Sequence, residues 1–132
     1  MHFKNKKHGN AFEEVFGTLD RKNYSLLAAV FLLTADADLW RRAVNAVSKY
    51  DINFGNINLA NCGRTTYTLC AAAEDLFTGS THLPLRDMAD PQIIQPISYR
   101  LICCAMDISR KGIKSVWLKS ERFYIDLEDT ET

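Results

Sequence analysis

The sequence feature that most limits the fold is an uninterrupted apolar run, LLAAVFLL, at residues 26–33. Its alanine and leucine content favours helix over strand, so we predict a helix over residues 24–35. A helix without a polar face must be enclosed by other elements, which places this one at the centre of the core. Phe31, within the run, is therefore predicted to be largely buried.

Amphipathic patterns on both sides of this run predict further helices. One covers residues 5–19, and the next begins after Asp36 or Asp38, since either carboxylate can cap its first turn. Another covers residues 65–77 and ends at Gly79, a natural residue for the position after a helix.

The last predicted helix has two alternative starts. It begins near Asp90 and kinks at Pro96, or it begins at Pro96 itself, because proline is tolerated in a first turn. Either way it ends at Gly112. Its predicted apolar stripe consists of Ile97, Leu101, Cys104, Ala105 and Ile108.

The rest of the chain shows weaker patterns. Residues 49–63 are rich in Asn and Gly and predict a packed loop with at most one short strand, and residues 80–90 predict a connection. Residues 113–127 alternate apolar and polar side chains, which favours one or two strands, with a poorly amphipathic helix as the alternative. We predict a mainly α fold: a compact bundle of about five helices over residues 1–112, and a short β-like arm with an acidic, mobile end over residues 113–132.

Charge argues against several function classes. The 16 basic and 16 acidic residues balance, and no basic cluster marks a nucleic-acid surface, so a nucleic-acid partner is not expected. The N-terminal sequence MHFKNKKHGN shows no signal peptide, and the longest apolar run is too short to cross a membrane. We therefore expect a soluble, cytoplasmic protein without a membrane partner, whose cysteines are reduced.

The cysteines and histidines show no metal-binding spacing. Cys103 and Cys104 are adjacent, Cys62 and Cys70 are too far apart for a knuckle, and no close pair of histidines exists. A nucleophile pair of Cys70 with His82 has no supporting pattern. We expect no metal, no cofactor and no catalytic residues, which makes an enzyme the least favoured class.

Two short stretches are candidates for binding anions. The first consists of Gly63, Arg64, Thr65 and Thr66 at a predicted helix start. Glycine lets a ligand approach the backbone closely and arginine supplies a cation, so this arrangement attracts phosphate. A capped helix with a solvated arginine is the simpler interpretation. The basic stretch KNKKH at residues 4–8 can contact phosphate or an acidic partner, with a frayed N-terminus as the simpler interpretation.

Several stretches together resemble a known family. They are FKNKKH at 3–8, AAVFLLTADADLWR at 28–41, CAAAEDLFTG at 70–79 and PLRDM at 84–88. Over residues 1–110 the chain is similar to a family of short, uncharacterised helical proteins of Firmicutes and their phages, which open with an FK-x-K-x-H stretch. This resemblance implies no activity, but it implies a small bacterial or phage-associated accessory or regulatory protein.

The expected function is that of a non-enzymatic module that binds an unidentified protein partner. The alternative is a nucleic-acid or nucleotide-binding module that uses the basic N-terminal half and the helix start at Arg64. In the arm, Trp117, Phe123, Tyr124 and Ile125 give more apolar surface than a free tail exposes. We expect these residues to form an interaction surface, with a homodimer favoured over folding back on the same chain.

Overall fold

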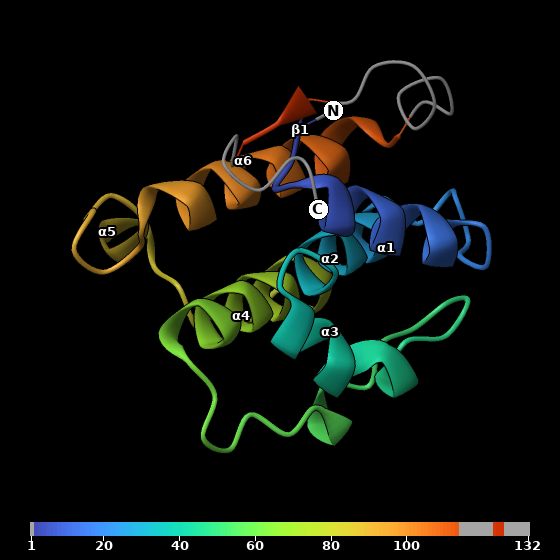
Figure 1. Cartoon of the computed structure of the whole chain (residues 1–132), viewed down its shortest axis with the longest axis horizontal. Coiled ribbons are helices and arrows are strands. Elements are labelled where there is room, and N and C mark those ends of the chain that lie inside the picture. The colour runs from blue at the N-terminus through green and yellow to red at the C-terminus, as the bar shows by residue number, and fades with distance from the viewer. Residues whose placement is uncertain (1, 114–122, 126–132) are drawn as a thin grey trace.

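The computed structural model describes residues 2–113 and 123–125. Within these residues the chain is mainly helical, as predicted, with a very small sheet (Figure 1). The elements are β1 (His2–Phe3), α1 (Lys6–Phe16), α2 (Tyr24–Leu33), α3 (Ala37–Ala43), α4 (Arg64–Thr78), α5 (Leu85–Met88), α6 (Pro96–Lys111) and β2 (Phe123–Tyr124), with 3-10 turns at Val44–Ala46 and Phe54–Asn56.

Helix α2 is the centre of the core, as its sequence predicts. Every residue from Leu26 to Leu33 is buried, and the helix packs most extensively against α4 and α6. Phe31 is fully buried, so that prediction is confirmed. Its ring lies within a cluster that also contains the rings of Phe3, His8 and Phe12. The aromatic side chains of the N-terminal segment thus pack against α2, and α1 lies beside α2 in Figure 1.

Helix ends follow the predicted chemistry. Asp36 caps α3 by accepting a hydrogen bond from the Leu39 N–H at 2.9 Å. Helix α4 ends at Gly79, whose left-handed backbone has φ 79°. Pro96 occupies the first turn of α6, which decides between the two predicted starts of that helix.

The structure corrects three local predictions. Residues 85–88 form the short helix α5 within the predicted connection, because Pro84 fixes an extended backbone immediately before it. On α6, Ile102 is buried and Ile97 is exposed, because the face that packs on the core carries Ser98, Leu101, Ile102, Ala105 and Ile108. The predicted frayed segment at residues 4–8 is ordered: Phe3, immediately before it, is fully buried, which offsets the entropy of ordering the segment.

The described part of the C-terminal arm contacts its own chain. Strand β2 pairs in parallel with β1, with Phe3 opposite Tyr124, and the Ile125 N–H donates to the Phe3 carbonyl at 2.8 Å. Tyr124 and Ile125 pack against the core, whereas Phe123 is 54% exposed and stacks on His2. These residues fold back on the bundle, and the expected homodimer remains a prediction.

Candidate functional site

An apolar hollow lies between the C-terminal half of α4, the short helix α5 and α6. Its volume is about 430 Å³, within the range of roughly 300–1,000 Å³ typical of binding pockets. Nearly all of its lining is apolar, with Asp75 and Tyr99 supplying the polar atoms. The other lining residues are Ala72, Leu76, Leu83, Leu85, Met88, Ala89, Ile102 and Met106.

A second hollow of about 480 Å³ continues from the first. The two share Met88, Ala89 and Tyr99, and the second extends over Pro91, Ile94 and Pro96 toward the start of α6. Together they form one elongated depression bordered by α5 and α6, which we call the α5 groove. The α5 groove is an open depression that runs along α6, and this shape suits an elongated ligand better than a compact one.

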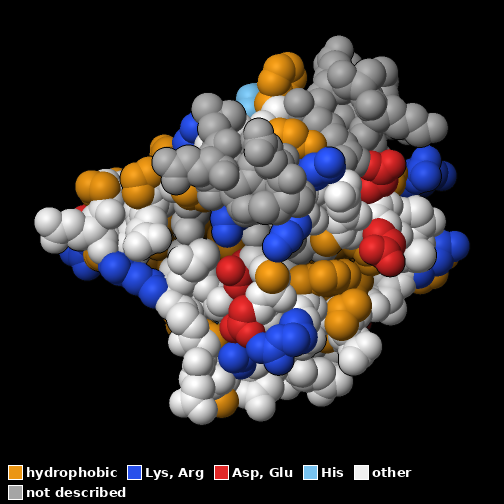
Figure 2. Space-filling view, in the orientation of Figure 1, with side chains coloured by type: hydrophobic (Ala, Val, Ile, Leu, Met, Phe, Trp, Pro, Cys, Tyr) orange, Lys and Arg blue, Asp and Glu red, His pale blue; other side chains and the backbone are white. Residues whose placement is uncertain are grey.

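The α5 groove exposes apolar side chains that a folded chain normally buries. Leu85 is 86% exposed, Tyr99 is 45% exposed and Met106 is 39% exposed. Hydrophobic side chains are visible on the surface at the end of the molecule where α5 lies (Figure 2). Scattered apolar residues are ordinary on protein surfaces, but a contiguous set beside a hollow is characteristic of a binding site.

Asp75 fixes one wall of the groove. From α4, its carboxylate accepts hydrogen bonds from the Ser80 hydroxyl at 2.7 Å, the His82 N–H at 2.9 Å and the Leu83 N–H at 2.8 Å. It also contacts the His82 ring at Nδ1, 2.8 Å away. Burial raises the pKa of Asp75, but these hydrogen bonds outweigh it, so the pKa lies below its usual value. The hydrogen bond to Asp75 raises the pKa of His82. Asp75 thus ties residues 80–83, and with them the start of α5, to α4.

Ser80, His82 and Asp75 do not form a catalytic relay. A serine nucleophile and its orienting carboxylate must contact opposite nitrogens of the histidine ring. Here the Ser80 hydroxyl, at 3.1 Å, and the Asp75 carboxylate both lie against Nδ1 of His82. Their arrangement is that of a turn held by hydrogen bonds, which positions the groove wall and provides no activated nucleophile.

The four residues predicted to bind an anion lie at the start of α4. Gly63 precedes the helix with an extended backbone, and Thr65 is half-buried. The Arg64 guanidinium donates to the Gln92 carbonyl, and the Thr66 hydroxyl donates to the Asp36 carboxylate at 2.6 Å. Arg64 and Thr66 therefore join neighbouring segments of the chain, and an anion at this place remains a prediction.

The four cysteines are free thiols. Cys70 is buried, and burial raises its pKa to about 11, so the thiol is protonated and a poor nucleophile near neutral pH. Within the described residues no three His, Cys, Asp or Glu side chains gather in a way that would hold a metal ion.

The predicted interaction residues fall partly inside the described chain. Phe123 is exposed, Tyr124 and Ile125 are half-buried, and Trp117 lies outside the described residues. The α5 groove was not among the sites predicted from the sequence. The available signal was a second apolar stripe on α6, formed by Tyr99, Ile102 and Met106 at i, i+3 and i+7.

Comparison of the chain with protein families, curated proteins and solved structures finds no match. The resemblance to short Firmicutes and phage proteins accordingly remains an expectation. Among the described helices, none has the length and apolar character required to cross a membrane.

Proposed function

We propose that this chain is a non-enzymatic interaction module whose α5 groove binds an amphipathic helix of a partner protein. The observation that carries the proposal is the exposed apolar lining of an elongated groove, with Leu85 almost fully exposed at its edge. An amphipathic helix buries its apolar face in such a groove through side chains at i, i+3 or i+4, and i+7. An accessory or regulatory role agrees with what the family resemblance implies.

A helix suits the groove better than a small molecule does. Small-molecule sites combine apolar walls with several convergent polar groups that orient the ligand, whereas Asp75 is already engaged by its own turn. The groove also continues past Met88 and Tyr99 into the second hollow, which extends its apolar surface along α6. Two methionines, Met88 and Met106, line it, and their flexible side chains adapt to the shapes of partner residues.

A selected peptide tests this proposal directly. A library of helical peptides with apolar residues at i, i+4 and i+7 is displayed against the purified chain, and binding of the selected peptides is measured by fluorescence anisotropy. We expect Leu85→Lys and Met106→Lys to weaken binding by roughly tenfold or more, because each places a charge on an apolar contact. Tyr50→Lys is the matched control, since Tyr50 is 62% exposed and lies outside the groove.

Two results would contradict the proposal. In the first, the selected peptides bind the groove variants and the wild-type chain equally well. In the second, sedimentation shows a dimer that Leu85→Lys converts to a monomer, which would make a second copy of the chain the occupant of the groove. Circular dichroism of each variant establishes that the helices are intact.

A further inference from the structure

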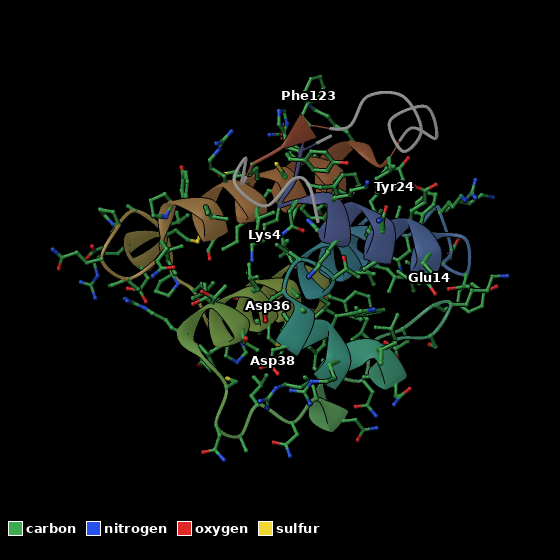
Figure 3. All side chains as sticks on the ribbon, in the orientation of Figure 1. Lys4, Glu14, Tyr24, Asp36, Asp38 and Phe123 are labelled. Atoms are coloured by element: carbon green, nitrogen blue, oxygen red, sulfur yellow. The ribbon has the colours of Figure 1, made fainter. Side chains whose placement is uncertain are left out.

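A third hollow, separate from the α5 groove, lies between the start of α1 and the start of α3. Its volume is about 410 Å³, and it is the more polar of the two sites. Lys4, Lys7 and Arg41 line it together with the carboxylate of Asp36 and the ring of Trp40. Figure 3 shows Lys4 and Asp36 on the same side of the molecule, at the beginnings of the two helices. We call this hollow the α1–α3 pocket.

The lysines give the α1–α3 pocket a positive charge that no ion pair among the described residues neutralises. Within the described residues, neither Lys4 nor Lys7 forms an ion pair. The Arg41 guanidinium bonds to Asp38, but its side chain remains 72% exposed and can accept a second anionic partner. Among the described lining residues Asp36 supplies the one carboxylate, and Asp38 pairs with Arg41 from outside the lining, so Lys4 and Lys7 give the pocket an excess of positive charge. An anionic group is therefore the ligand chemistry that this side of the pocket attracts.

Two further lining groups, the Asp36 carboxylate and the Trp40 ring, favour a ligand that carries more than an anionic group. One oxygen of Asp36, Oδ2, accepts from the Leu39 N–H and the Thr66 hydroxyl, while its other oxygen has no hydrogen-bond partner within the described residues. A carboxylate oxygen in this position accepts from a ligand hydroxyl. Trp40 packs against the core, is half-buried and lines the pocket, and an indole ring is a side chain on which flat aromatic ligands stack.

We propose that the α1–α3 pocket binds a mononucleotide. Lys4, Lys7 and Arg41 contact the phosphate, the open oxygen of Asp36 accepts from a ribose hydroxyl, and the base stacks on Trp40. The three kinds of lining group match the three parts of such a ligand. The pocket volume lies within the range of roughly 300–1,000 Å³ of pockets that enclose small organic ligands.

The test is a titration with adenosine monophosphate and its fragments. In a Trp117→Phe background, Trp40 is the sole tryptophan, because the chain contains two. We expect adenosine monophosphate to quench Trp40 fluorescence saturably, and inorganic phosphate and adenosine each to bind roughly tenfold or more weakly, since each lacks part of the contacts. The 2′,3′-dideoxy nucleotide should bind several-fold more weakly, because it offers no hydroxyl to Asp36. Calorimetry on the unmodified chain measures the same affinities without the tryptophan substitution.

Matched lysine variants locate the site. We expect the double change Lys4→Gln with Lys7→Gln to weaken binding by roughly tenfold or more. The control is Lys22→Gln with Lys49→Gln, which removes the same charge from exposed loop positions outside the pocket. Three results would each overturn the proposal: no saturable binding at millimolar nucleotide, equal loss in both double variants, or equal affinity for phosphate and the nucleotide. Affinity that rises with the length of a single-stranded oligonucleotide would instead assign the lysines to a nucleic acid.

Discussion

Because His8 is buried as a neutral ring, the free energy of unfolding of this protein decreases as the pH falls. The ring is 2% exposed and lies against Phe3 and Phe31. Its Nδ1 accepts from the Lys4 N–H at 2.8 Å, because a backbone N–H can only donate. Nε2 therefore carries the proton and donates to the Phe31 carbonyl, also at 2.8 Å. Both nitrogens of the neutral ring are satisfied, and protonation would break the bond from Lys4.

The pKa of His8 moves accordingly. Burial lowers it from 6.5 to about 3, against the raising effect of the Phe31 carbonyl and together with the nearby charge of Lys4. The folded chain therefore binds fewer protons at this site than the unfolded chain. The contribution of His8 to the free energy of unfolding is fully present above pH 6.5. It is lost as the pH falls from 6.5 toward 3, by about 1.36 kcal/mol per pH unit. Between pH 7 and pH 5 the loss from His8 is about 2 kcal/mol.

Urea denaturation followed by circular dichroism measures this loss against a non-titrating reference. In His8→Gln the side-chain amide can still donate toward the Phe31 carbonyl, but it does not ionise. Other titrating groups, including His82 and Asp75, contribute equally to both proteins and cancel in the comparison. We expect the wild-type chain to lose about 2 kcal/mol more than His8→Gln between pH 7 and pH 5. Equal losses would refute this account, as would an NMR titration in which the His8 ring protonates near pH 6.

Three further predictions follow from packing and backbone geometry. Phe31→Ala should lower the free energy of unfolding, measured by denaturant, by about 3–5 kcal/mol, because it leaves a cavity in the centre of the core. A loss below about 1 kcal/mol would contradict the central position of α2. Gly112→Ala should lower the free energy of unfolding more than Gly79→Ala in the same assay. Both glycines have positive φ, but a Cβ at Gly112 would lie 2.7 Å from the Tyr24 ring, whereas a Cβ at Gly79 would meet open space. Equal losses for the two variants would contradict this. Asp75→Asn should raise amide hydrogen exchange over residues 80–89 and leave α2 protected, because it weakens the bonds that hold the groove wall; unchanged exchange there would show that other contacts hold it.

Much of the fold could be predicted because local chemistry and tertiary packing agree. The run at residues 26–33 identifies the central helix since no polar face exists to meet water. Gly79 and Pro96 mark helix ends because each has a backbone preference that few neighbours can override. At such positions the residue type alone largely determines the backbone conformation.

The α5 groove was not predicted from the sequence, and of the α1–α3 pocket only the basic stretch at residues 4–8 was, because both sites depend on contacts between distant segments. One wall of the groove is held by the hydrogen bonds of Asp75 to residues 80–83, and the sequence of this short connection does not predict those bonds. On α6, Ile97 and Ile102 are equally apolar, and only the packing of the helix decides which is buried. The α1–α3 pocket likewise joins a basic stretch and a tryptophan that are more than thirty positions apart, from Lys4 to Trp40.

Helix α4 connects the two sites mechanically. At its start, Thr66 bonds to Asp36, which lines the α1–α3 pocket, and nine residues later Asp75 holds the wall of the α5 groove. At about 1.5 Å per residue these two contacts are about 14 Å apart along the axis. The helix between them is buried from Thr68 to Ala73 and packed against α2, and close packing of this kind transmits a displacement from one end of an element to the other. We infer that a nucleotide bound at Asp36 affects partner binding at the α5 groove through the Asp36–Thr66 hydrogen bond, which joins the lining of the α1–α3 pocket to α4. By linkage, any such coupling has the same magnitude in both directions.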